Sequence, residues 1–167
     1  MQVTGFAQAA VSPVLLVFGV GMIVGNLLGG RRADRRPTAT LLGTLAALVV
    51  VLGAMGLVLH SKPAMIAFVG LLGVAAFATV APLQLRVLEH AHGAGQNLAS
   101  SLNIAAFNLG NALGAWLGGV VIASGAGMVA TPWVAAALTA LGLGIALWSV
   151  QLQRRQAALP AGCVQGR

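Results

Sequence analysis

The chain has 167 residues, of which 59% are hydrophobic and only 7% are charged, and its mean hydropathy is +0.96. Because a soluble domain carries roughly 25% charged residues, this composition excludes an ordinary soluble protein and predicts an all-α integral membrane protein or a piece of one. The formal net charge is +7, and the basic residues lie at the ends of apolar runs. Their placement indicates membrane orientation and does not predict nucleic-acid binding.

Five apolar runs follow one another along the chain, each close to the roughly 20 residues that a membrane-spanning helix needs. The predicted spans are residues 7–30, 38–59, 63–88, 97–122 and 131–152, and residues 153–167 are predicted to form a disordered cytoplasmic tail. Pro37 and Pro63 open the second and third runs, where a helix has no backbone bond to lose. Thr131 and Pro132 are predicted to cap and open the fifth span, and Pro82 is predicted to kink the third.

The break between the first two runs, from Gly25 to Pro37, holds four arginines and Asp34. Since each arginine at mid-bilayer costs roughly 2.5 to 3.5 kcal/mol, this loop must lie in water. Alternation of five spans then divides the basic residues between two sides of the membrane. One side holds Arg31, Arg32, Arg35, Arg36, Arg86, Arg154, Arg155 and Arg167, and the other holds Lys62. The positive-inside rule therefore predicts an outside N-terminus and a cytoplasmic C-terminus.

Two ridges of small residues recur at helical spacing. They consist of Gly21, Gly25 and Gly29 in the first span and Gly110, Gly114 and Gly118 in the fourth. Such ridges let helix backbones approach closely in lipid. They predict either tight packing or dimer contact, or faces that slide against a partner helix.

The fourth span also carries a polar face. Its members are Asn97, Ser101, Asn108 and Asn111, which fall within a stripe of about 80° by helix geometry. Ser100 and Asn103 lie beside the glycine ridge, about 100° away. Asparagines inside a hydrophobic span need partners or a hydrated cavity. These residues therefore either form hydrogen bonds between helices or line a cavity that faces a solute. Thr79 and Gln84 of the third span are further candidates for the same cavity.

Asp34 and Glu89 are the only carboxylates, and both fall at the predicted cytoplasmic edge. No carboxylate of this chain can therefore serve as a mid-membrane proton relay. We hypothesise a charge network of Asp34, Arg35, Arg86 and Glu89 that latches the ends of the first three spans, the alternative being solvated charges.

An enzymatic or metal-binding alternative rests on His90 and His92 alone, and the chain has no catalytic motif. No enzyme activity, cofactor or metal site is predicted.

Gly30-x-x-x-Asp34-Arg35, placed in a loop between two spans, resembles the G-x-x-x-D-R-x-G-R-R signature of the major facilitator superfamily. The glycine expected after Asp34-Arg35 is absent, which favours the degraded second copy of that signature, between the eighth and ninth helices. Residues 81–89, APLQLRVLE, and 97–119, NLASSLNIAAFNLGNALGAWLGG, are similar to the tenth and eleventh helices of the sugar-efflux and drug:proton antiporter branch, the arabinose-efflux-permease type.

The resemblance implies that the five spans are helices eight to twelve of a twelve-helix inner- or plasma-membrane transporter, a partial bundle. It implies export of a sugar or small drug-like solute by proton antiport and alternating access. The implied partners are the lipid bilayer, the solute and a missing N-terminal half, which would supply the coupling acids. Asn103, Asn108 and Asn111 would approach the solute pathway. The alternative function is a small structural membrane protein that associates through its glycine ridges.

Overall fold

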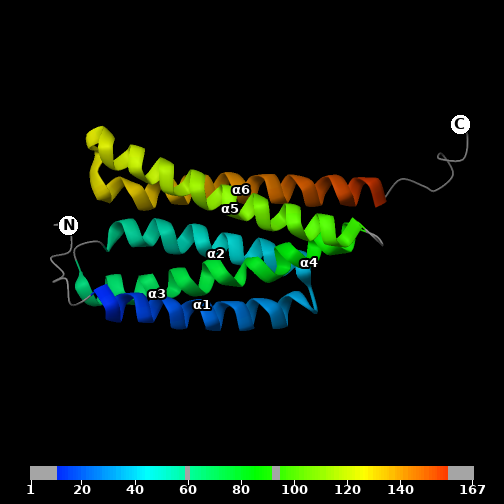
Figure 1. Ribbon diagram of the computed structural model, residues 1–167, viewed down its shortest axis with the longest axis horizontal. Helices are drawn as coiled ribbons and strands as arrows, with labels where there is room; N and C mark the ends of the chain where they lie inside the picture. Colours follow the sequence, from blue (N-terminus) through cyan, green and yellow to red (C-terminus); the bar gives the residue numbers. More distant parts are fainter. Residues whose placement is uncertain (1–10, 59–60, 92–94, 158–167) are drawn as a thin grey trace, which may run out of the picture.

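The computed structural model describes residues 11–58, 61–91 and 95–157, and these residues are helical almost throughout (Figure 1). The elements are α1 (Val11–Ala33), α2 (Pro37–Leu57), α3 (Lys62–Ala78), α4 (Val80–His90), α5 (Gly95–Val121), η2 (Ile122–Ala126) and α6 (Gly127–Ala157). Helices α3 and α4 form one continuous span, so the described residues provide five stretches long and apolar enough to cross a membrane. The predicted all-α membrane fold with five spanning helices is confirmed.

The helix boundaries follow the prolines in two places and depart from the prediction in two others. Helix α2 begins at Pro37, and α3 begins one residue before Pro63. Helix α6 instead begins at Gly127, which places Pro132 inside the helix. The predicted capping role of Thr131 is therefore wrong, and its hydroxyl oxygen is buried without a hydrogen-bond partner among the described residues.

The earlier start of α6 has a local cause in the turn before it. Gly125 and Gly127 both have positive φ angles, 84° and 72°, which glycine adopts without steric cost. These two residues reverse the chain between α5 and α6, so the helix can begin ahead of Thr131.

Helix α6 also continues to Ala157, five residues into the predicted tail, because arginines are good helix formers and Arg154 and Arg155 lie favourably at a helix C-terminus. The rest of that tail, and residues 7–10 and 59 of the predicted spans, lie outside the described residues.

The described charges gather at the two ends of the bundle as the loop alternation requires. The α1–α2 connection, the end of α4 and the end of α6 lie at one end of the molecule, and the start of α3 lies at the other (Figure 1). The first end carries Arg31, Arg32, Arg35, Arg36, Arg86, Arg154 and Arg155, and the second carries Lys62. The apolar lengths of the helices between them can therefore occupy the hydrocarbon layer without a charge at its centre.

Helices α1 and α3 make the closest packing in the structure, backbone against backbone. Gly21, Gly25 and Gly29 are buried, and they face Gly70, Val74 and Ala78 of α3, in each case 49 residues further along the chain. The two helices are therefore parallel and in register. A Cβ atom at Gly29 would lie 2.5 Å from the carbonyl oxygen of Ala78, and one at Gly21 or Gly25 would overlap the carbonyl facing it. Only glycine permits this approach.

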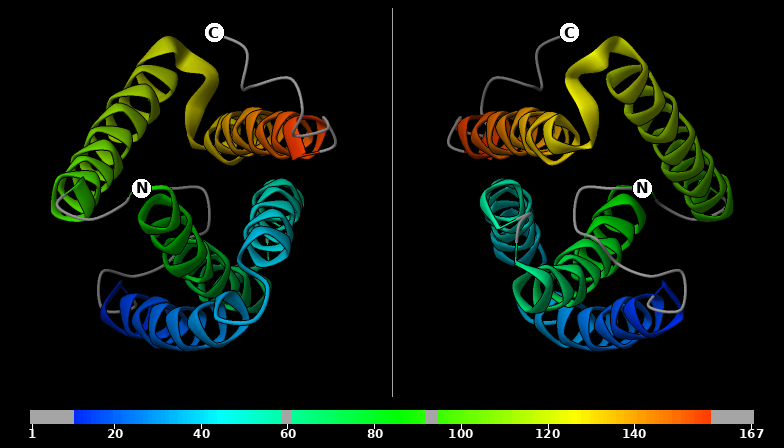
Figure 2. Two further views of the ribbon diagram at one scale, coloured as in Figure 1. Left: turned by 90° about the vertical axis from the view of Figure 1, so that its right-hand side faces the viewer. Right: turned by 90° about the vertical axis from the view of Figure 1, so that its left-hand side faces the viewer.

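Helix α2 joins this pair to α6. A Cβ atom at Gly56 would lie 2.6 Å from Nε1 of Trp133, so the glycine leaves room for the indole ring of α6. By contrast, α5 has no buried residue and contacts the rest of the bundle mainly through α4 and the η2 turn. Figure 2 shows α5 at the opposite edge of the bundle from α1.

We predict that Gly25→Ala destabilises the bundle by about 1–3 kcal/mol, the usual cost of overpacking, because α1 and α3 must move apart. Gly19→Ala is the matched control, since a Cβ atom there would meet nothing within 4 Å. That variant should be neutral or more stable by up to about 1 kcal/mol, from helix propensity. Unfolding of the detergent-solubilised chain by a denaturing detergent measures both. Equal effects of the two substitutions on stability would contradict the close approach of the α1 and α3 backbones at Gly25.

Candidate functional site

A polar cluster of Gln84, Ser100 and Asn103 links α4 to α5. Nε2 of Gln84 donates a hydrogen bond to Oγ of Ser100 at 2.8 Å, and Nδ2 of Asn103 donates to Oε1 of Gln84. Ser100 and Asn103 are three residues apart and therefore share one face of α5. All three side chains are partly buried. Since both ends of the Gln84 amide are engaged, the cluster fixes the position of α5 against α4.

Thr79 lies at the interruption between α3 and α4, three residues before the fully buried Pro82. Its hydroxyl group donates to the carbonyl oxygen of Ala75 at 3.0 Å, within its own helix. Proline offers no N–H group to the preceding turn, which accounts for an interruption at this place. Thr79 therefore shapes the bend above Gln84 and is not part of the polar cluster.

The other predicted polar residues of α5 face outward. Nδ2 of Asn108 donates to the carbonyl oxygen of Ile104 at 3.0 Å, and Oγ of Ser101 donates to that of Asn97 at 3.0 Å. Asn108 and Asn111 are both exposed. The structure thus divides the polar residues of α5 into a group that binds α4 and a group that no described helix covers.

The charged residues at the arginine-rich end are arranged differently from the hypothesised latch. A guanidinium nitrogen of Arg86 donates to Oε1 of Gln153 on α6 at 2.7 Å. In the described part of the chain, neither Asp34 nor Glu89 makes a side-chain hydrogen bond or ion pair. The network of Asp34, Arg35, Arg86 and Glu89 is therefore not formed in this conformation.

Gln153 has a role that the sequence prediction missed. It falls within the tail that is predicted to be disordered, and only the continuation of α6 to Ala157 brings it beside Arg86. The signal in the sequence was the run of good helix formers after Leu152, with arginines suited to a helix end.

Within the described residues, no group of three His, Cys, Asp or Glu side chains could hold a metal ion. His90 ends α4, and His92, the other half of the metal-binding alternative, lies outside those residues.

The second glycine ridge has no partner within the described structure. Gly110, Gly114 and Gly118 are adjacent to open space, since a Cβ atom at any of them would meet nothing within 4 Å. Residues 110–119, GNALGAWLGG, nevertheless repeat residues 21–30, GMIVGNLLGG, with five of ten positions identical. The same surface is thus packed in α1 and open in α5.

The comparison with protein families matches this all-helical membrane chain to a known group. The family described as Major Facilitator Superfamily matches residues 1–162. The chain belongs to the major facilitator superfamily. It is accordingly a multi-pass inner-membrane protein of a family of transporters.

Several members of the major facilitator superfamily resemble this chain over most of its length. The inner membrane transport protein YdhP of Escherichia coli O157:H7 is 40% identical over 151 residues, which are 90% of this chain and 39% of YdhP. The putative transporter AraJ of Escherichia coli strain K12 is 30% identical over 95% of the chain and 40% of AraJ. A chloramphenicol resistance protein of Streptomyces lividans is 30% identical over 85% of the chain and 36% of that relative.

The chain therefore spans about two fifths of the length of these relatives. No solved structure matches it significantly.

We predict that Gln84→Leu loosens α5, because it removes both hydrogen bonds that join α4 to Ser100 and Asn103. Such bonds average about 0.6 kcal/mol each in membrane proteins, so the loss of roughly 1 kcal/mol should speed local opening about fivefold. Amide hydrogen exchange over residues 97–107 of the detergent-solubilised chain measures this effect.

Gln151→Leu is the control, since Gln151 is exposed on α6 and makes no side-chain hydrogen bond to any described residue. Exchange in α1 should be unchanged in both variants. Unaltered exchange of α5 in Gln84→Leu would mean that the polar cluster does not hold this helix.

Proposed function

We propose that the chain is part of an efflux permease that exports a sugar or a small drug-like solute by proton antiport and alternating access. The likeness to relatives named as transport proteins supports transport, and the likeness to one named for chloramphenicol resistance supports a small drug-like solute. In this family fold, two halves rock against each other around a central site. The chain supplies helices of one half and needs the other half to transport.

The observation that carries the proposal is the open polar face of α5. Asn108 and Asn111 are exposed in the middle of an apolar helix, where contact with lipid would leave the amide group of Asn111 and the amide oxygen of Asn108 without partners. A hydrated pathway satisfies such groups and lets them bind hydroxyl-rich or polar solutes. Asn103, whose amide is already held by Gln84, would stand at the edge of that pathway, and Thr79 would set the bend of the helix behind it.

The open glycine ridge supports the proposal that further helices belong to this bundle. Helix α5 runs antiparallel to α1, and each carries the same glycine spacing (Figure 1). This relation is what an inverted repeat within a transporter half produces. We propose that a helix from the rest of the transporter lies on Gly110, Gly114 and Gly118, as α3 lies on the ridge of α1.

The placement of acids supports a coupling site outside this chain. Asp34 and Glu89 both lie at the arginine-rich end of the bundle, and the helices between the two ends carry no carboxylate in the described residues. Proton antiport requires a group that binds and releases a proton along the pathway. We propose that this group belongs to the other half of the transporter.

We also propose that the loop signature, Gly30 with Asp34 and Arg35, acts together with Arg86 and Glu89 as a conformational latch. The described conformation has Arg86 bonded to Gln153, so the latch would form in a different state of the transport cycle. A charge pair that forms in only one state shifts the equilibrium between states.

We predict that the chain alone does not transport, because half of the cavity wall is absent. Co-expression with a YdhP polypeptide from which the matched residues have been deleted should restore export, measured as efflux or resistance in cells. Gly114→Leu should leave the isolated chain equally stable or more stable by up to about 1 kcal/mol, from helix propensity at an open site, and abolish this restoration.

The co-expression experiment also tests the structural alternative, in which the open ridge of α5 binds a second copy of the chain. A stable homodimer without restored export would favour that function. Export by the isolated chain in vesicles would contradict the proposal that it is one part of a transporter.

We predict that Asp34→Arg and Arg86→Glu each reduce export in the restored transporter by several-fold and that the double variant recovers it, because the exchanged charges can pair again. Restoration is the diagnostic result for direct coupling. Losses that simply add would show that Asp34 and Arg86 act independently, as solvated charges.

A further inference from the structure

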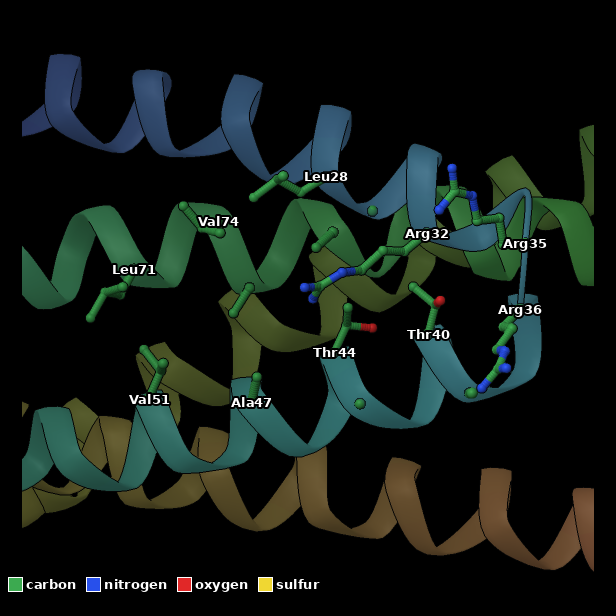
Figure 3. Close-up of a pocket in the computed structure, with 15 residues that line it drawn as sticks. Leu28, Arg32, Arg35, Arg36, Thr40, Thr44, Ala47, Val51, Leu71 and Val74 are labelled. Atoms are coloured by element: carbon green, nitrogen blue, oxygen red, sulfur yellow. The ribbon is translucent and has the colours of Figure 1, made fainter.

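A cleft of about 760 Å³ lies between α1, α2 and α3, outside the polar cluster (Figure 3). Residues of these three helices and of the α1–α2 connection line it, and none comes from α4, α5 or α6. Since α5 lies at the opposite edge of the bundle, the cleft is separate from the polar face proposed as the solute pathway (Figure 2). Its volume falls in the range of roughly 300–1,000 Å³ that is usual for ligand sites.

The lining of the cleft is polar at one end and apolar at the other. The polar end is formed by Arg32, Arg35, Arg36 and Thr40, and the apolar part by Ala47, Val51, Leu71 and Val74. From Thr40 to Val51, eleven residues of helix span about 16 Å. That depth is about half of the roughly 30 Å hydrocarbon core, which is the thickness of one leaflet.

Arg32 is the residue that sets the chemistry of the cleft. Its side chain extends from α1 back along the helix, away from the α1–α2 connection and toward the level of Thr44 on α2 (Figure 3). This direction follows from the tilt of helical side chains toward the N-terminus. Neither described carboxylate pairs with this guanidinium group. A positive charge directed toward the hydrocarbon layer without a partner is costly, so an anion at this position would be bound strongly.

We propose that this cleft binds an anionic phospholipid from the leaflet on the arginine-rich side. The phosphate group lies at Arg32 and the neighbouring arginines, and one acyl chain lies along Ala47, Val51 and Leu71. Basic pockets between spanning helices attract anionic headgroups. A phospholipid also matches the cleft in depth and in its change from polar to apolar along the membrane normal. A bound lipid would hold the ends of α1 and α2 together, where these helices make few contacts of their own.

The test is a titration of the purified full chain in detergent with phosphatidylglycerol, followed by native mass spectrometry. Phosphatidylglycerol should bind at least tenfold more tightly than phosphatidylcholine. Arg32→Gln should weaken phosphatidylglycerol binding by roughly tenfold or more, as the loss of one charge-assisted hydrogen bond predicts. Arg31→Gln is the matched control, since it removes the same charge from the same turn, and Arg31 does not line the cleft.

A second pair of variants tests the acyl-chain part without changing any charge. Ala47→Trp fills the apolar end and should weaken binding, whereas Ala46→Trp places the same ring on an exposed position outside the cleft. Equal losses in Arg31→Gln and Arg32→Gln, or equal losses in the two tryptophan variants, would overturn the proposal. Binding of glycerol 3-phosphate as tight as that of phosphatidylglycerol would also overturn it, because the site would then be one for a free phosphate ester.

Discussion

The bundle depends on one contact, the approach of the α1 and α3 backbones along Gly21, Gly25 and Gly29. In a membrane, apolar side chains gain nothing by leaving lipid for one another, so helices associate through close packing and hydrogen bonds. The α1 ridge provides the close packing, because each glycine leaves room for a backbone carbonyl group of α3. A side chain at any of these positions would overlap that carbonyl group. Helix α2 then packs on α3, and α6 packs on α2, so the positions of α2 and α6 follow from this pair.

The two glycine ridges differ in their surroundings, since the ridge of α1 is packed against α3 and the ridge of α5 is open. Its sequence repeats that of the first, and the helix that carries it runs in the opposite direction, yet Gly110, Gly114 and Gly118 face open space. Helix α5 is held instead by the hydrogen bonds of Gln84 to Ser100 and Asn103, while Asn108 and Asn111 stay exposed. An unpacked ridge and uncovered asparagines on one helix have a common explanation if a further helix and a hydrated pathway lie beside it. The cleft at Arg32 lies on the other side of the bundle, and there we propose that a phospholipid binds.

Sequence patterns predicted what depends on composition and local chemistry. Hydropathy gave five spans, and Pro37 and Pro63 marked two helix starts because a first-turn proline loses no bond. The predicted N-cap at Thr131 is wrong because two glycines with positive φ reverse the chain before it, and the helix begins four residues earlier, at Gly127. Gln84 and Asn103 could be singled out as polar residues in apolar spans, but their pairing depends on how α4 crosses α5. Likewise, the bond from Arg86 to Gln153 and the cleft around Arg32 arise from side-chain directions in three dimensions, which periodicity does not specify.

We propose that the glycine ridge of α5 packs against a helix from the rest of a major facilitator transporter. A cryo-electron microscopy structure of the chain assembled with the complementary part of such a transporter would show whether this contact forms. We expect a helix backbone to lie as close to Gly114 as that of Val74 lies to Gly25, with Asn108 and Asn111 facing a hydrated cavity. A ridge at Gly110, Gly114 and Gly118 that faces lipid, or that faces a second copy of this chain, would contradict the proposal.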